Sequence, residues 1–141
     1  AQEKFDGFRA FWNGSELRSR QGEKFAAPEW FVDGLPNHPL DGELYLGRGR
    51  FSELNAMVWN SESPLWAQAE YIFFDAPLNP GGIVGRLGFV NHYCAKARPA
   101  HLFQVGPGTA EYLNEILTTG GEGLMLRDPN APYTRGRTDD C

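Results

Sequence analysis

Apolar residues recur along this chain in short runs that glycine and proline interrupt, a pattern typical of short strands and helices joined by tight turns. The stretch "RAFWNGSELRSRQG" predicts a hairpin, with Asn13 and Gly14 as the two positive-φ residues of its turn. The apolar run 71–74 in "AEYIFFDAPL" predicts a buried strand that ends at Asp75 and Pro77. Further strands are predicted in "PLDGELYLG", "HLFQVG" and "EGLMLRD".

Helical spacing is clearest in "TAEYLNEILTTGG", where Thr109 can cap the start and Gly120 can end the helix. Its apolar face is predicted to consist of Tyr112, Leu113, Ile116 and Leu117. Shorter helices are predicted in "APEWFVDGLP" and "FSELNAMVW", while two glycines weaken the helical pattern of "IVGRLGFVNHYCAKAR". This order of strands and helices predicts one α+β domain, with mostly antiparallel sheets and flanking helices around a cleft.

Composition excludes some classes of function. The 141 residues are 41% hydrophobic, which is enough for a packed core, and no apolar run approaches the length of a membrane span. Cys94, Cys141 and three scattered histidines make no plausible zinc site. A net charge of −5 has the wrong sign for binding nucleic acid by bulk electrostatics.

Arginine nevertheless dominates the basic residues and occurs three times as an i, i+2 pair, at 18/20, 48/50 and 135/137. On a strand this spacing places both guanidinium groups on one face, where they could contact phosphates. Solvated edge charge is the alternative explanation for any single pair.

Four short segments carry candidate chemistry. In "EKFDGFR", Lys4 could act as a nucleophile if a bound metal or Arg9 helps it lose its proton, and Asp6 could hold the amine. The other three segments are "LDGELY" with Glu43, "YIFFDAP" with Phe74, and "GGEGLMLR" with Glu122 and Arg127. Taken alone, the lysine segment is as consistent with a plain turn as with a nucleophile, and ordinary strand structure explains each of the others better.

Together, the order KxDGxR, DGEL, FFD and EGLMLR resembles the nucleotidyltransferase (adenylation) domain of ATP-dependent DNA ligases. The segments "SRQG", "APEWF", "GLPNHPLDGEL", "GRGRF" and "DPNAPYTRGRTDD" extend the resemblance over nearly the whole chain and make it most similar to the small ligases of bacteria and viruses. The resemblance implies the ATP-grasp-like fold shared by DNA ligases and mRNA capping enzymes, built around a nucleotide cleft.

This resemblance also implies a lysyl-AMP mechanism and a set of roles. Lys4 would attack the α-phosphate of ATP, Asp6 would orient the amine or a metal-bound water, and Arg9 would contact the ribose or the nick. The implied nucleotide-binding residues are Glu3, Lys4, Arg9, Glu43, Phe74 and Glu122, with Phe74 stacking on adenine. Glu43 and Glu122 would hold Mg²⁺ or Mn²⁺. Arg20, Arg135 and Arg137 would contact DNA phosphates.

In the implied reaction, AMP passes from the lysine to a DNA 5′-phosphate, and the 3′-hydroxyl of a nick then displaces it. The expected partner is nicked double-stranded DNA, in repair, recombination or replication, and no membrane. The expected compartment is one that contains DNA, or the periplasm for an exported small bacterial enzyme.

The family pattern continues, past "GRTDD", into a K-x-K motif and an oligonucleotide-binding (OB-fold) domain, neither of which lies in residues 1–141. We therefore expect a partial adenylation domain, truncated at both ends, monomeric and with little or no nick sealing of its own. An RNA ligase or mRNA capping enzyme shares KxDG, although "EGLMLRDPNAPY" favours the DNA enzymes. A truncated, non-catalytic module that binds nucleotide or DNA is the third alternative.

Overall fold

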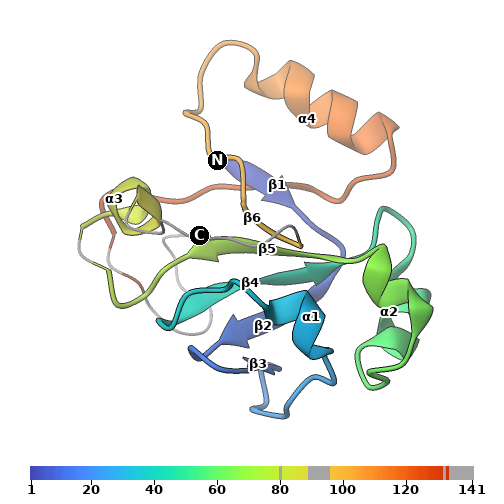
Figure 1. Cartoon of the computed structure of the whole chain (residues 1–141). Helices are drawn as coiled ribbons and strands as arrows, with labels where there is room; N and C mark the ends of the chain where they lie inside the picture. Colours follow the sequence, from blue (N-terminus) through green and yellow to red (C-terminus); the bar gives the residue numbers. More distant parts are fainter. Residues whose placement is uncertain (80, 89–95, 132, 134–141) are drawn as a thin grey trace.

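The computed structural model of the chain describes residues 1–79, 81–88, 96–131 and 133, and Figure 1 shows their arrangement. The elements follow in the order β1 (Gln2–Lys4), β2 (Phe8–Trp12), β3 (Leu17–Arg18), α1 (Glu29–Val32), β4 (Leu40–Tyr45), α2 (Phe51–Met57), the 3-10 helix η1 (Pro64–Ala67), β5 (Glu70–Asp75), α3 (Ile83–Gly88), β6 (Ala97–Pro99), α4 (Thr109–Thr118) and β7 (Gly123–Met125). This mixture of strands and helices confirms the predicted α+β class.

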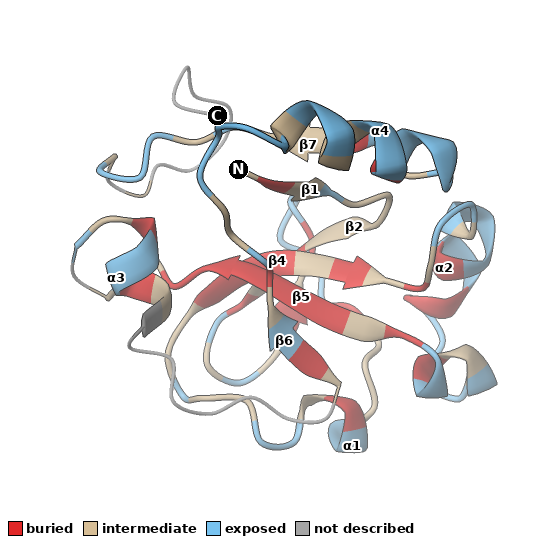
Figure 2. Ribbon diagram, turned by 90° about the horizontal axis from the view of Figure 1, so that it is seen from above, coloured by how far each residue is buried: buried red, intermediate tan, exposed pale blue. Residues whose placement is uncertain are grey.

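Within the described residues the strands form two sheets. The larger has the order β3-β2-β4-β5-β6 and is antiparallel except for the parallel pair β5–β6. The smaller pairs β1 with β7 antiparallel, so the start of the chain lies against 123–125. Figures 1 and 2 show the β1–β7 pair and α4 on one side of the larger sheet, with α1 on the other. No helix in the described residues is long and apolar enough to cross a bilayer.

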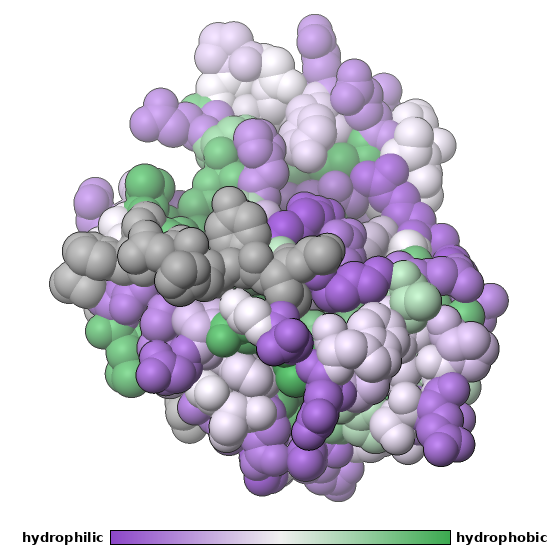
Figure 3. All heavy atoms as spheres, viewed as in Figure 1, coloured by the Kyte–Doolittle hydropathy of each residue, from purple (hydrophilic) through white to green (hydrophobic). Residues whose placement is uncertain are grey.

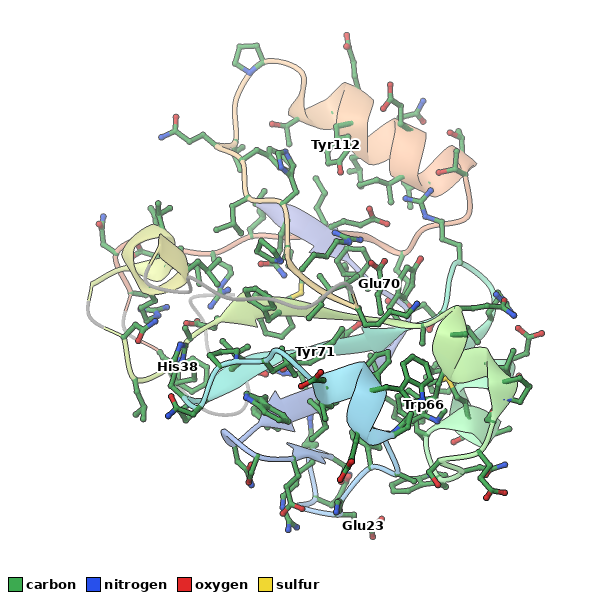
Figure 4. The ribbon with its side chains drawn as sticks, viewed as in Figure 1. Glu23, His38, Trp66, Glu70, Tyr71 and Tyr112 are labelled. Atoms are coloured by element: carbon green, nitrogen blue, oxygen red, sulfur yellow. The ribbon has the colours of Figure 1, made fainter. Side chains whose placement is uncertain are left out.

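One face of the larger sheet carries the main core. Alternate residues of a strand share a face, and Ala10 of β2 and Leu44 of β4 project to this one, where both are fully buried. The helices α1, α2 and η1 cover this face, with Phe31, Met57 and Trp66 as buried contributors. Figure 4 shows Trp66 beside α2 and Tyr71 near the centre of the sheet.

The opposite face of the larger sheet carries the polar residues. Glu43 alternates with the buried leucines of β4 and therefore projects to this side, as the sequence predicted. A smaller cluster of Ile72, Phe74 and Ala100 lies here and packs against Phe5 and Tyr45. Because Phe5 follows β1 directly, this cluster joins the larger sheet to the β1–β7 pair.

Two glycines allow the strands at this site to approach closely. A Cβ atom at Gly7 would lie 2.2 Å from the Leu44 carbonyl oxygen, and one at Gly42 would lie 2.4 Å from the Ile72 carbonyl oxygen. Real Cβ atoms do not approach backbone that closely, so both positions require glycine for packing. The glycine of KxDG thus has a structural reason: it brings the lysine segment against β4.

The predicted hairpin is present, but its turn is longer than expected. Trp12 pairs with Leu17, so residues 13–16 form the loop, and of the two predicted positive-φ residues only Gly14 has that conformation. Asn13 instead accepts hydrogen bonds at Oδ1 from the backbone amides of Ser15 and Glu16. An Asx-type turn, not a two-residue turn, therefore reverses the chain.

The strand predicted in "HLFQVG" is wrong: residues 101–106 form no strand, and β6 lies just before them at Ala97–Pro99. After β6 the chain leaves the sheet, and Phe103 exchanges backbone hydrogen bonds with Ala1. That contact joins residues 102 positions apart, so the local sequence pattern could not predict it.

The helix α4 occurs where predicted, with two differences. Gly108 is its N-cap residue, and Thr109 lies inside the first turn, where its hydroxyl accepts a hydrogen bond from the Gly106 amide. Leu117 is 52% exposed, so Ile116 alone of the predicted face is fully buried. Figure 4 shows Tyr112 on this helix.

The two arginine pairs that lie in the described residues, 18/20 and 48/50, do not form the strand faces that the spacing suggested. Only Arg18 of the first pair lies on a strand, and 48/50 lie in the loop before α2. Arg48 donates to Glu3 and Thr119, and Arg50 donates to Glu53 and Gln68. These side chains are occupied by contacts within the fold. Figure 3 shows hydrophilic residues spread over much of the visible face, with apolar residues in small groups.

Candidate active site

Lys4 lies at the last position of β1, opposite Gly123 of β7. Its Nζ atom is 3.7 Å from Oε2 of Glu122, and its side chain is 58% exposed. The β1–β7 pairing thus brings together two candidate residues 118 positions apart in the chain, 4 and 122. An exposed amine beside one carboxylate is accessible to a reactant, as a nucleophile must be.

Glu43 lies directly across the strand ladder from Arg9. Its Oε2 atom is buried and has no hydrogen-bond partner in the described part of the chain. Burial raises the pKa of Glu43 to about 7; Arg9 opposes that shift, and the negative charges of Glu122 and Asp6 add to it. Native proteins rarely leave a buried carboxyl oxygen unpaired, so this atom needs a partner, which a ligand or an ordered water can supply.

Arg9 pairs with Asp41 and not with Glu43. Its Nε and Nη2 atoms donate to the two carboxylate oxygens of Asp41 at 2.7 and 2.5 Å, and Asp41 is fully buried. The guanidinium carbon lies 5.3 Å from the ring centre of Phe11 and 4.8 Å from that of Phe74. A bidentate pair between two aromatic rings fixes the plane of the guanidinium group.

Phe74 is the predicted adenine platform, and it is buried in this structure, with 5% of its surface exposed. The guanidinium of Arg9 covers its ring, and that of Arg127 lies 5.9 Å from the ring centre. A base could therefore stack on Phe74 only if one of these arginines moved, so the role stays a prediction.

Asp75, the residue after Phe74, anchors a buried ion network. It accepts hydrogen bonds from Arg86 at 2.6 and 3.0 Å and from Arg127 at 2.7 Å. Arg127 also donates to the Phe74 carbonyl oxygen, and Arg86 donates to that of Ala131. The segment after β7 is thereby tied to β5 and α3, beside the candidate site.

Two grooves of about 410 and 320 Å³ lie beside Arg9, and Ser19 and Arg20 line both of them. The first is also lined by Phe11, Asn13, Arg18 and Gly22. The second is also lined by Gly7, Phe8, Gln21, Phe25, Glu43, Phe51 and Trp59. Arg20, a predicted phosphate contact, therefore lies near Arg9 and Glu43.

Gln2 was missed by sequence reasoning. It precedes the lysine by two positions, is 1% exposed, and its Oε1 atom has no hydrogen-bond partner in the described residues. Glu3, which was the predicted nucleotide contact, instead accepts a hydrogen bond from Arg48 at 2.7 Å. Alternation along β1 could have separated these two residues, since Gln2 and Lys4 share a face that Glu3 does not.

The comparisons with known proteins bear on the fold of the chain. No family model matches the chain. A DNA ligase of Haemophilus influenzae is 29% identical to it, over 96% of this chain and 53% of that protein. A solved structure of a Lig E DNA ligase covers 99% of this chain with 32% identity and a TM-score of 0.86. This chain has the fold of a DNA ligase adenylation domain.

The predicted resemblance to ATP-dependent DNA ligases is thereby confirmed. The Chlorella virus DNA ligase-adenylate has the same fold at 22% identity, covering 97% of this chain with a TM-score of 0.76. The chain spans 53% of the Haemophilus ligase, 58% of the Lig E chain and 55% of the Chlorella virus chain, about half the length of these relatives.

Within this adenylation-domain fold, Lys4, Glu43 and Glu122 interact electrostatically, as does Asp6 with Glu43. No group of three or more His, Cys, Asp or Glu side chains in the described residues is arranged to hold a metal ion. The predicted Glu43 and Glu122 would thus supply at most a two-carboxylate site. Arg135, Arg137, Cys94 and Cys141 lie outside the described residues.

Proposed function

We propose that this chain is the adenylation unit of an ATP-dependent DNA ligase. The observation that carries the proposal is the accessible Lys4 amine beside Glu122, in the fold of a Lig E DNA ligase. In the proposed step the amine first loses a proton to solvent, because only the neutral form is a nucleophile. Its nitrogen then attacks the α-phosphorus of ATP, the bond to the bridging oxygen breaks, and pyrophosphate leaves. The nitrogen, now bonded to phosphorus, loses a second proton to solvent. The product is lysyl-AMP.

Two unpaired buried oxygens suggest where the nucleoside binds. The amide of Gln2 lies two positions before Lys4 on the same face of β1, and a glutamine amide can read the amino edge of adenine. The carboxyl of Glu43 can hydrogen-bond a ribose hydroxyl, which would satisfy its unpaired Oε2 atom. Arg9 uses two of its N–H groups on Asp41 and can use the others on the ribose or a phosphate.

A divalent metal fits these residues. Mg²⁺ binds through one or two carboxylates and keeps several waters, so Glu122 meets its needs, and Glu43 can add a second carboxylate through the oxygen that the ribose leaves free. When bound, the metal neutralises charge that develops on the phosphates. The protein itself supplies the nucleophile, Lys4, and a positive charge near the phosphates, Arg9.

The grooves beside Arg9 support DNA as the AMP acceptor. Arg20 is exposed and lines both of them, and the exposed rings of Phe51 and Trp59 border the one that contains Glu43. Arginine suits phosphate geometry, and exposed aromatic rings pack against bases or sugars. We propose nicked double-stranded DNA as the substrate, with Arg20 on a phosphate. Sealing would follow when the 3′-hydroxyl of the nick displaces AMP.

The first test is covalent labelling with ATP carrying ³²P at the α-phosphate, in the presence of Mg²⁺, followed by a denaturing gel. The chain should retain label, and Lys4→Ala should abolish it because the nitrogen that forms the bond is gone. Lys24→Ala is the matched control: Lys24 is equally exposed and lies 3.3 Å from Glu16, away from the β1–β7 pair. It should label like the unchanged chain.

Label that persists in Lys4→Ala would remove Lys4 as the nucleophile. A chain that binds ATP but takes up no label would favour the non-catalytic nucleotide-binding module. Label from GTP in place of ATP would favour a capping enzyme, and a preference for RNA ends in the transfer step would favour an RNA ligase.

A further inference from the structure

The phenol of Tyr133 donates a hydrogen bond of 2.7 Å to Oδ2 of Asp41, the same oxygen that accepts from Nη2 of Arg9. Residues 41 and 133 are 92 positions apart, so the chain after β7 returns to β4 at this one carboxylate. Asp41 is fully buried and, in the described part of the chain, accepts from Arg9 and Tyr133. A buried carboxylate needs such donors, and each one restricts its orientation.

Arg9 has a second carboxylate within reach. Glu43 lies directly opposite it on the strand ladder and has an unpaired buried oxygen, yet Arg9 donates to Asp41. Cross-strand neighbours of opposite charge normally pair. Something must therefore favour Asp41 as the partner, and Tyr133 is the other donor that holds Asp41 in place.

The choice of partner affects the whole site. Arg9 lines both grooves, and an Arg9–Glu43 pair would occupy the oxygen that we assign to the nucleotide or metal. We propose that Tyr133 is a positioning residue: by holding Asp41, it keeps the Arg9 guanidinium between the two grooves and away from Glu43. Only the second readout below rests on the proposed function.

The chemistry of Tyr133 suits this role. Burial and the neighbouring charge of Asp41 raise the pKa of its phenol, so the hydroxyl stays protonated and donates at any physiological pH. The segment that carries it is held independently by Arg86, which donates to Ala131, and by the Ile83 amide, which donates to Pro129. Removing the hydroxyl should therefore free Asp41 without releasing the segment.

The test compares Tyr133→Phe with Tyr112→Phe, whose ring packs against Phe103 and lies on α4, away from β4 (Figure 1). The first readout is proton exchange at the Arg9 Nε–H group by ¹⁵N NMR, with the signal assigned by its loss in Arg9→Lys. Tyr133→Phe should exchange this proton about tenfold faster, because the Nε–H bond to Asp41 then opens more often. Tyr112→Phe should leave the exchange rate unchanged. In the double variant Asp41→Asn/Tyr133→Phe, the exchange rate of the Arg9 Nε–H proton should rise by less than the sum of the increases in the two single variants.

The second readout is the rate of covalent labelling as a function of ATP concentration. Loss of positioning should raise the KM for ATP about tenfold with a smaller change in kcat, whereas partial unfolding would lower the labelled amount at unchanged KM. Unchanged Arg9 exchange in folded Tyr133→Phe would overturn the proposal, as would faster exchange with an unchanged KM. Faster exchange in a chain that never takes up label would support positioning of Arg9 by Tyr133, while the proposed function would fail.

Discussion

Glu43 combines burial with an unpaired oxygen, and both follow from its neighbours. Gly7 packs so close that a Cβ atom there would lie 3.1 Å from the Glu43 Oε2 atom, and Arg9 is engaged by Asp41. The alternation of β4 predicted the direction of the side chain. It did not predict the missing partner, because Asp41 and Glu43 share a face and the sequence gives no reason for Arg9 to prefer one.

This environment makes stability depend on pH. The pKa of Glu43 rises from 4.5 in the unfolded chain to about 7 in the fold, so the folded state holds the proton over that range while the unfolded state releases it. The contribution of Glu43 to the free energy of unfolding is therefore largest below pH 4.5. It falls as the pH rises to 7, by about 3 kcal/mol at most. Glu43→Gln cannot ionise and should escape this loss.

Urea unfolding of the unchanged chain and Glu43→Gln at several values between pH 4.5 and 8 measures the effect. The variant should gain stability relative to the unchanged chain as the pH rises. Glu62→Gln, at an exposed position, controls for the loss of a carboxyl group in general. A difference between Glu43→Gln and the unchanged chain that stays constant over this range would contradict the assigned burial.

At the scale of elements, the strands β4 and β5 were predictable because each combines apolar residues with clear ends. The α1 turn was also predictable, since Pro28 precedes it and Gly34 has the positive φ that ends it. The loop 101–106 was not, because its Phe103 backbone pairs with that of Ala1, at the other end of the described chain, and not with a neighbouring strand of the larger sheet. Local pattern fails where the partner is distant in sequence.

The close pairing of β4 and β5 gives a test at this scale. In Gly42→Ala the new Cβ atom would lie 2.4 Å from the Ile72 carbonyl oxygen and 2.7 Å from the Phe73 Cα atom, so the two strands must separate. We expect a loss of roughly 2–3 kcal/mol in the free energy of unfolding.

Gly106→Ala is the matched control. A Cβ atom there meets nothing within 4 Å, and the backbone has no positive φ. Its free energy of unfolding should change by less than about 0.5 kcal/mol. Equal denaturation midpoints for Gly42→Ala and the unchanged chain would show that the strands are not packed as described.

At the scale of the whole molecule, the two ends of the described chain meet at the site. The β1–β7 pair brings Lys4 to Glu122, the β2–β4 pair brings Arg9 to Glu43, and Tyr133 reaches Asp41. The order of the sequence motifs implied that the first two pairs share a site, and the structure brings both together. The hydrogen bonds from Arg9 and Tyr133 to Asp41, and from Arg127 to Asp75, join segments 32 to 92 positions apart and could not be predicted from local pattern.

The most direct test of the central claim is to locate the AMP adduct. The chain is incubated with ATP and Mg²⁺, digested under alkaline conditions that preserve a phosphoramidate, and its peptides are analysed by mass spectrometry. We expect AMP on Lys4 and an unmodified Lys24 in the same digest. AMP on any other residue would contradict the assignment of Lys4, and a chain that binds ATP without forming an adduct would contradict the proposed adenylation.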